Sequence, residues 1–243
     1  MKSAYLSHKG NVRELNEDSV YAGELADKAF LALVADGMGG YNAGEIASRM
    51  AVDEVRQCLP SLDGKGLAEG FRQANQKIFD LAVSKPEYRN MGTTLAGCII
   101  KENMLYAANV GDSRIYLICG KKIRQITVDH SYVQELVSLG LISSREAEHH
   151  PEKNMITRAL GTERYINVDV YQVPWKNNEL LLLCSDGLTN MLEGSQIVKI
   201  LSRPASCEEY VSELVSAAEE AGGRDNITAI CVMREGTMPE TVF

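Results

Sequence analysis

Two apolar runs of this chain each end in Asp-Gly, and these two points constrain the fold more than any other feature. Residues 30–35 run into Asp36-Gly37, and residues 180–185 run into Asp186-Gly187. Such runs are typical of strands buried on both faces. A buried strand that ends in Asp-Gly places a carboxylate at the rim of a sheet, where the glycine lets the backbone approach whatever the carboxylate binds. Either pair alone also fits an ordinary turn.

Composition places the chain among ordinary globular proteins. Its 243 residues are 45% hydrophobic and 24% charged, which is enough to build a core without disulfides. No linker rich in Pro, Gly or Ser divides the sequence, so we expect a single domain over residues 1–243. The net charge of −8, from 33 acidic and 25 basic residues, argues against nucleic-acid binding, which would need a basic patch.

The cysteines and the hydropathy indicate the compartment. No two of the six cysteines are close enough for a CxxC or zinc motif, and Cys98, Cys119, Cys184 and Cys231 lie in apolar strand-like runs. Buried free thiols suit a reducing cytosol. The first residues lack the apolar core of a signal peptide, and no run approaches the ~18 apolar residues of a membrane span. We therefore expect a cytoplasmic protein with no membrane partner.

Hydrophobic periodicity predicts the order of the elements. Strands are expected at 3–8, 18–22 and 29–35, then a loop of small residues at 37–42 and helices at 43–59 and 66–84. Four strands follow at 93–101, 103–110, 113–119 and 122–127, with hairpin turns expected at Gly111-Asp112 and Gly120-Lys121. A short helix at 131–139 precedes an irregular polar segment at 140–165. Strands at 166–173 and 179–185, helices at 194–202 and 206–221, and a strand at 226–233 complete the chain. This order predicts antiparallel sheets with a helix pair covering each outer face.

Acidic residues gather at the expected strand ends and turns. These aspartates are Asp18, Asp36, Asp112, Asp186 and Asp225. Carboxylates at the ends of apolar strands are costly unless they are solvated, paired or bound to metal. Oxygen ligands without His or Cys favour Mg²⁺ or Mn²⁺, and several carboxylates can hold two ions ~4 Å apart that activate water and bind a phosphoryl group.

Some of these residues also fit plainer roles. Arg13 can offer a bidentate fork to phosphate oxygens, but it can equally form a surface ion pair. Asp112 fits a plain hairpin turn, and Asp18 fits a turn cap. His130 is expected to open the helix at 131 as a structural residue.

The motifs taken together resemble those of one family. They are residues 10–18 (Gly-Asn-Val-Arg-Glu-Leu-Asn-Glu-Asp), 36–40 (Asp-Gly-Met-Gly-Gly), 91–94 (Met-Gly-Thr-Thr), 111–114 (Gly-Asp-Ser-Arg), 129–131 (Asp-His-Ser), 156–161 (Ile-Thr-Arg-Ala-Leu-Gly), 185–188 (Ser-Asp-Gly-Leu) and 224–228 (Arg-Asp-Asn-Ile-Thr). In this order they resemble the metal-dependent serine/threonine protein phosphatases, the protein phosphatase 2C type, in their compact bacterial form. Each motif alone is weak, but the whole set is very specific.

The resemblance implies an α+β fold, a four-layer α-β-β-α sandwich with the metal site at one end of its two antiparallel sheets. Asp36 would bridge two core Mn²⁺ or Mg²⁺ ions, the Gly37 carbonyl would bind one of them, and Asp186 with Asp225 would hold the other. Asp112 with Asp186 would hold a weaker third ion. Glu17 and Asp18 would lie beside the site, as ligands or through water. Arg13 would hold the substrate phosphate, and residues 140–160 would form a flap.

The resemblance also implies an activity, the hydrolysis of phosphoserine and phosphothreonine by direct attack of a metal-bound hydroxide. Arg13 and Asp36 would be the catalytic residues. The partners would be phosphoproteins, among them a cognate serine/threonine kinase and its substrates, and the protein would be a monomer. Met38 follows Asp36-Gly37 where animal members carry a His proposed as general acid, so the proton donor stays open. Two other hypotheses remain, a non-catalytic regulatory module on the same fold and another metal-dependent phosphoester hydrolase.

Overall fold

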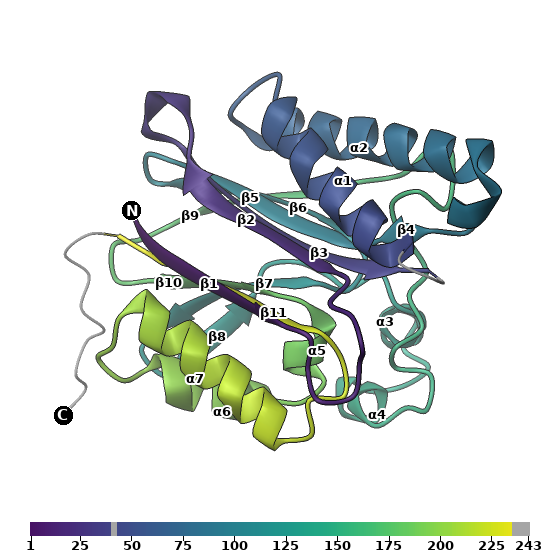
Figure 1. The fold of residues 1–243 in the computed structure, drawn as a ribbon. Coiled ribbons are helices and arrows are strands. Elements are labelled where there is room, and N and C mark those ends of the chain that lie inside the picture. The colour runs from purple at the N-terminus through teal and green to yellow at the C-terminus, as the bar shows by residue number, and fades with distance from the viewer. Residues whose placement is uncertain (40–42, 235–243) are drawn as a thin grey trace.

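Two antiparallel sheets lie face to face in the computed structural model, which describes residues 1–39 and 43–234 (Figure 1). One sheet has the order β1-β11-β10-β7-β8, and the other has the order β2-β3-β5-β6-β9, with β4 paired to β3. The first sheet contains β1 (Lys2–His8), β11 (Ile227–Met233), β10 (Leu180–Cys184), β7 (Arg114–Cys119) and β8 (Lys122–Gln125). The second contains β2 (Asp18–Glu24), β3 (Phe30–Met38), β4 (Gly92–Thr93), β5 (Leu95–Lys101), β6 (Met104–Val110) and β9 (Asp169–Pro174).

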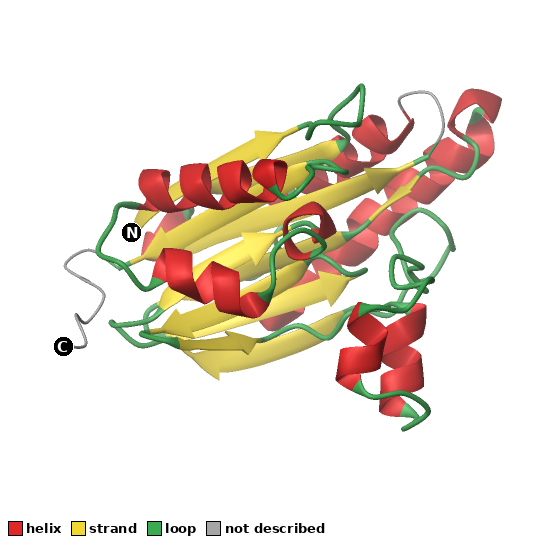
Figure 2. Ribbon diagram, turned by 90° about the horizontal axis from the view of Figure 1, so that it is seen from below, coloured by secondary structure: helices red, strands yellow, loops and turns green. Residues whose placement is uncertain are grey.

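Helices cover both outer faces, as Figure 1 shows. α1 (Ala43–Gln57) and α2 (Gly64–Ser84) pack on the second sheet, while α6 (Gly194–Leu201) and α7 (Cys207–Glu220) pack on the first. The predicted four-layer α-β-β-α sandwich is confirmed. The short helices α3 (Tyr132–Ser138) and α4 (Ser144–Glu148) lie beside one end of the sandwich (Figure 2). α5 (Asp186–Thr189) follows β10 directly, and short 3₁₀ turns stand at Ala26–Lys28 and Pro86–Tyr88.

The strand period of two decides which way the functional side chains face. On β3, Phe30, Ala32 and Val34 pack between the sheets, whereas the alternate residues pack under α1 and α2. On β10, Leu181 and Leu183 likewise face the space between the sheets. Because side chains alternate along a strand, Asp36 continues the series that points toward the opposite sheet. The hydrophobic layer between the sheets therefore ends in a carboxylate.

Local capping explains where the long helices begin. The Asp63 carboxylate accepts from the Gly66 N–H at 2.9 Å at the start of α2. Ser206 and Glu209 form a reciprocal capping box at the start of α7. Each such cap is worth about 1 kcal/mol, which adds to the burial of the apolar helix face against its sheet.

One predicted hairpin is wrong. The pairing of β7 with β8 through Gly120 is confirmed, but β6 pairs with β5 and β9 while β7 pairs with β10. The Gly111-Asp112 link therefore crosses from one sheet to the other and is not a hairpin turn. Both strands are apolar on both faces, so the local pattern is the same for a hairpin and for a crossing. Only the packing of the two sheets distinguishes them.

Smaller differences lie at other boundaries. The strand expected at 93–101 is interrupted at Thr94, and the segment expected to be irregular contains α4. Ala159 and Leu160 from that segment are buried, and Leu160 belongs to the core under α1 and α2. All six cysteines are free, but Cys119 is only partly buried. Gly40, in the expected loop of small residues, lies outside the described residues.

Among residues 1–39 and 43–234, no helix is both long enough and apolar enough to cross a membrane.

Candidate active site

Asp18 joins the two sheets at the end where β3 finishes. It stands directly opposite Asp36 in the β2–β3 ladder. Its Oδ2 accepts hydrogen bonds from two hydroxyls that belong to the first sheet or directly follow one of its strands. They are Ser185 Oγ at 2.8 Å and Thr228 Oγ1 at 2.6 Å. Its Oδ1 is buried and has no hydrogen-bond partner among the described residues. One oxygen of Asp18 is thus held in place while the other is left to accept a further ligand.

The main chain of Asp36 is fixed by two threonines. Its N–H donates to Thr94 Oγ1 at 2.9 Å, and its carbonyl accepts from the Thr94 N–H at 2.9 Å and from Thr93 Oγ1 at 2.9 Å. The N–H and the carbonyl of Asp36 therefore have hydrogen-bond partners that do not involve its carboxylate. This arrangement leaves the side chain of Asp36 available to the space between the sheets.

The glycine after each aspartate is required by the neighbouring backbone. A Cβ on Gly37 would lie 2.2 Å from the Gly44 carbonyl oxygen and 2.6 Å from that of Glu17, and a Cβ on Gly187 would lie 2.0 Å from that of Asn226. Backbone atoms cannot move aside as a flexible side chain can, so any side chain here would displace the strand end. This crowding accounts for Asp-Gly at both sites.

Asp186 is presented by the first turn of α5. Its Oδ2 accepts from Asn190 Nδ2 at 2.8 Å, one helical turn on. Its Oδ1 is buried and, like that of Asp18, lacks a hydrogen-bond partner among the described residues. Unpaired buried carboxylate oxygens are unfavourable, so this pair of atoms indicates a site built to receive a cation.

The carboxylates raise each other's pKa. Burial raises the pKa of Asp18 to about 7 and that of Asp112 to about 8, and the neighbouring charge of Asp186 adds to both. Burial also raises the pKa of Asp36 and of Asp186, followed by the charges of the neighbouring aspartates. The aspartates predicted from the sequence, Asp225 included, therefore lie close enough to act on one another electrostatically.

Arg13 and Asp225 form a two-pronged ion pair. Arg13 Nη2 donates to Asp225 Oδ2 at 2.9 Å, and Arg13 Nε lies 2.9 Å from Oδ1. The hydrogen bond to Asp225 raises the pKa of Arg13, with further contributions from the charges of Asp36 and Glu17. The structure thus places Arg13 beside the carboxylates, with its fork on one of them.

Glu17 lies beside the same cluster but serves a helix as well. Its carboxylate faces the backbone N–H groups of Gly44 and Glu45 at the start of α1, and burial raises its pKa. Asn226 holds the segment that carries Arg13 and Glu17, because its Nδ2 donates to the carbonyls of Lys9 at 3.0 Å and Leu15 at 2.8 Å. Its Oδ1 accepts from the Glu17 N–H at 2.8 Å.

Four supporting residues were not predicted from the sequence. They are Ser185, Thr228, Asn190 and Asn226. Three of them stand in the recognised motifs, but their partners come from other elements and only the fold brings them together. Asn190 carried a local signal, since residues four apart on a helix meet on one face.

The oxygen-only ligand set fits a hard divalent cation. Within the part of the chain that the structure describes, no three His, Cys, Asp or Glu side chains are close enough to form a metal site by themselves. Water would have to complete the coordination, which is usual for Mg²⁺. The residues present, with the unpaired oxygens of Asp18 and Asp186, therefore fit such an ion.

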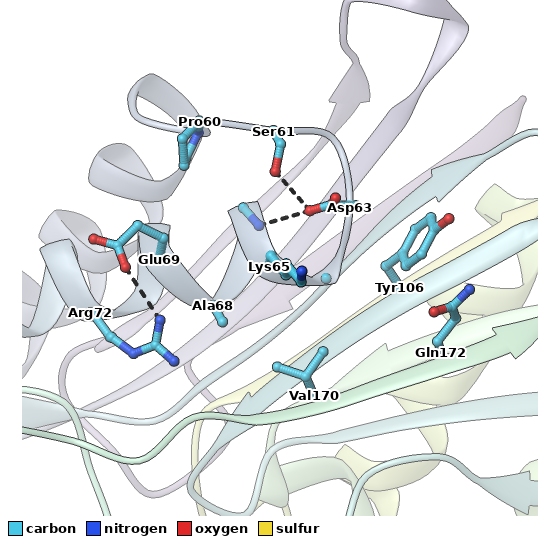
Figure 3. Close-up of a pocket in the computed structure, with 12 residues that line it drawn as sticks. Pro60, Ser61, Asp63, Lys65, Ala68, Glu69, Arg72, Tyr106, Val170 and Gln172 are labelled. Atoms are coloured by element: carbon cyan, nitrogen blue, oxygen red, sulfur yellow. Dashed lines mark hydrogen bonds and ion pairs between the residues drawn. The ribbon is translucent and has the colours of Figure 1, made fainter.

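A pocket of about 760 Å³ lies elsewhere, between the start of α2 and strands β6 and β9 (Figure 3). Two pairs of its polar side chains contact each other. Ser61 Oγ donates to Asp63 at 2.7 Å, and Arg72 pairs with Glu69 at 3.2 Å. None of the predicted site residues lines it.

The chain is similar to known proteins over nearly its whole length. A family model described as Protein phosphatase 2C matches residues 7–230. The chain is 39% identical over 242 residues to the "Serine/threonine phosphatase stp" of Listeria innocua, covering 96% of each. The structure of Stp1 from Staphylococcus aureus matches with a TM-score of 0.92 at 32% identity, over 97% of this chain and 96% of that one. The catalytic domain of the phosphatase PstP, solved in complex with two manganese ions, matches with a TM-score of 0.84 at 34% identity, over 95% and 96%.

Proposed function

The chain belongs to the protein phosphatase 2C family, and we propose that it hydrolyses phosphoserine and phosphothreonine in proteins at the carboxylate cluster around Asp36. The observation that carries the proposal is the convergence of Asp18, Asp36, Asp112 and Asp186 in one buried field, with two carboxylate oxygens lacking partners among the described residues. Such a cluster is unfavourable by itself and favourable around cations.

The proposed ligands are those that the family resemblance implies, and the buried carboxylates support them. Asp36 and the Gly37 carbonyl, with Asp186 and Asp225, would hold two Mn²⁺ or Mg²⁺ ions, as supported by the two manganese ions bound to the similar PstP domain. Asp112 with Asp186 would hold a weaker third ion. Glu17 and Asp18 would act from beside the site, as direct ligands or through water. When bound, such ions supply an activated water and offset the charge of the phosphoryl oxygens.

The chain's own residues orient the substrate. The Arg13 fork has the geometry for two phosphate oxygens, and it already lies next to the cluster. Taking up phosphate would require it to leave Asp225, at least in part. The acid for the leaving group is not assigned, because Met38 occupies the position after Asp36-Gly37.

We further propose a single phosphatase domain that acts as a cytoplasmic monomer, with residues 140–160 as a flap beside the site. The substrates would be phosphoproteins, among them a cognate serine/threonine kinase and its targets. The similarity along nearly the whole length to named serine/threonine phosphatases supports this substrate class.

The first test compares two substrates in the presence of Mn²⁺. A phosphothreonine peptide should be hydrolysed, whereas a nucleotide diester should be hydrolysed poorly. Arg13→Ala should raise KM for the peptide about tenfold, because a charged hydrogen-bonded contact to phosphate is lost. Arg72→Ala, which removes an exposed arginine of α2, is the matched control. No hydrolysis of the peptide would favour a non-catalytic module, and faster hydrolysis of the diester would favour another class of phosphoesterase.

A further inference from the structure

The link that carries Asp112 needs contacts other than strand pairing. β6 and β7 pair with different neighbours in different sheets, so the crossing at Gly111-Asp112 has no hairpin ladder to hold it. Gly111 has φ of +104°, and a Cβ there would lie 2.6 Å from the Thr94 side chain. Asp112 itself is buried. A buried carboxylate on such a link must be placed by the groups that bind its neighbouring peptides.

His130 provides those contacts from both sides of Gly111. The Gly111 N–H donates to His130 Nδ1 at 3.0 Å, and the His130 N–H donates to the Gly111 carbonyl at 2.9 Å. Asn109 Nδ2 donates to the same carbonyl at 3.0 Å. His130 is buried, with 7% of its surface exposed, so these bonds replace what water would otherwise supply.

The other ring nitrogen lies between an arginine and a carboxylate. His130 Nε2 is 2.9 Å from Arg158 Nη1 and 3.3 Å from Asp169 Oδ2. The two hydrogens of Arg158 Nη1 have acceptors of their own, Asp169 Oδ1 at 3.0 Å and the Asn167 carbonyl at 3.2 Å, so Nε2 need not accept from it. Because Nδ1 accepts from Gly111, a neutral ring must carry its hydrogen on Nε2, where it points to Asp169. Burial, followed by the charge of Arg158, lowers the pKa of His130, which favours this neutral form.

We propose that His130 is a positioning residue for Asp112: its Nδ1 lone pair fixes the Gly111 peptide and so sets where the Asp112 carboxylate enters the site. The proposal rests on the proposed function, in which Asp112 holds the weaker third ion. On the other flank of Asp112, Ser113 Oγ lies 2.8 Å from Thr94 Oγ1, whose hydroxyl also receives the Asp36 N–H. The residues before and after Asp112 are thus both held in place. Loss of the His130 contact should loosen the peptide of Gly111, which precedes Asp112.

Two variants of similar size separate the two ring nitrogens. In His130→Asn the side-chain oxygen can stand where Nδ1 stands, whereas in His130→Gln the amide can reach only the place of Nε2. Both remove ring packing to a similar degree. Mn²⁺ titration by calorimetry should show weak-ion affinity within about threefold of wild type for His130→Asn, and about tenfold lower for His130→Gln, the size of one lost hydrogen bond. In both variants the two tighter ions should bind as in wild type. In His130→Gln, kcat should fall with KM unchanged.

Asp112→Asn supplies the reference for the lost ligand. If Asp112→Asn leaves the weak ion bound as before, both the third-ion role and the positioning role are wrong. If Asp112→Asn weakens that ion while His130→Gln does not, only the positioning role is wrong. Equal losses in His130→Asn and His130→Gln, or losses that include the tighter ions, would also overturn it.

A measurement on the wild-type protein avoids any folding defect of the variants. Long-range ¹H–¹⁵N correlation of the imidazole rings should show His130 with hydrogen on Nε2 and an unprotonated Nδ1. A ring with hydrogen on Nδ1 would contradict the proposal.

Discussion

After Asp36-Gly37 the chain continues as a strand to Met38, whereas after Asp186-Gly187 it turns at once into α5. The two apolar runs before them are alike in length and composition. Gly37 stays extended because it pairs with Thr93 of β4, while the residues after Gly187 have no such strand beside them in the ladders of the described structure and close a helical turn. The same dipeptide thus carries its carboxylate on an extended strand in one case and on the first turn of a helix in the other.

The difference shows what each carboxylate depends on. The main chain of Asp36 is placed by bonds to Thr93 and Thr94. Asp186 is placed by its own side-chain bond to Asn190 within α5. We therefore expect Asp36 to tolerate the loss of either threonine hydroxyl, because the bond from the Thr94 N–H to its carbonyl remains. Asp186 should be more sensitive to the loss of its one side-chain partner Asn190.

Removing either carboxylate should have the largest effect. Asp36→Ala and Asp186→Ala should each lower turnover on a phosphothreonine peptide at least ~100-fold, because each removes a principal electrostatic group at the reacting centre. The two losses should be similar despite the different backbones. Steady-state kinetics at saturating Mn²⁺ measures this, and near wild-type turnover in either variant would contradict the shared centre.

The pH dependence of the cation-free protein should be the next largest effect. Asp18 and Asp112 titrate near 3.8 when unfolded, and burial raises their pKa to about 7 and about 8 in the folded protein. The folded state then binds more protons, so the contribution of these two groups to the free energy of unfolding is largest below pH 3.8 and is lost as pH rises to about 8. With chelator present, Tm should fall by several °C between pH 5 and pH 8, given ~2–4 °C per kcal/mol.

Asp18→Asn is the check on this pH slope. The variant removes one of the titrating groups while keeping its shape, so its Tm in chelator should fall less steeply over the same interval. A flat or rising Tm in the wild-type protein would contradict the raised pKa values.

A smaller effect should separate the two Asp-Gly sites. Asn190→Ala removes the hydrogen bond to Asp186 Oδ2, and bonds to charged groups are worth ~1.5–3 kcal/mol, so Mn²⁺ affinity at the core should fall by at least about tenfold. Thr189→Ala, in the same helix, removes only a 3.4 Å contact to the main-chain carbonyl of Asp186, which leaves the carboxylate bond intact, and should leave affinity unchanged. Calorimetry that finds the two variants alike would show that Asn190 does not place Asp186.

Some of this architecture could be predicted from the sequence, and the limits are physical. The apolar runs before Asp36 and Asp186 predicted buried strands, whereas the face to which Asp36 points became clear only from the packing of β3 between the sheets. Nothing local showed that β6 and β7 belong to different sheets, because both are apolar on both faces. The placing of Asp112 by His130 stayed hidden for the same reason.

The hydrogen-bond and ion-pair partners of the site residues could not be predicted from the sequence either. Arg13 was predicted to hold phosphate, and a surface ion pair was the alternative, while the fold sets its fork on Asp225. Ser185 and Thr228 stood in recognised motifs, but their common partner Asp18 comes from the other sheet. Contacts of this kind depend on sheet packing and not on spacing along the chain.

The most direct test of the central claim, that Asp36 and Asp186 build one cation site, is the Mn²⁺-induced shift in Tm. A cation bound only by the folded form at 100 times Kd adds about 2.7 kcal/mol, so wild-type Tm should rise by roughly 5–10 °C over the chelated protein. Asp36→Asn should lose most of this rise, whereas Asp80→Asn, which changes an exposed acid of α2, should keep it. Equal rises in wild type, Asp36→Asn and Asp80→Asn would mean that the ions bind elsewhere, and would contradict the account.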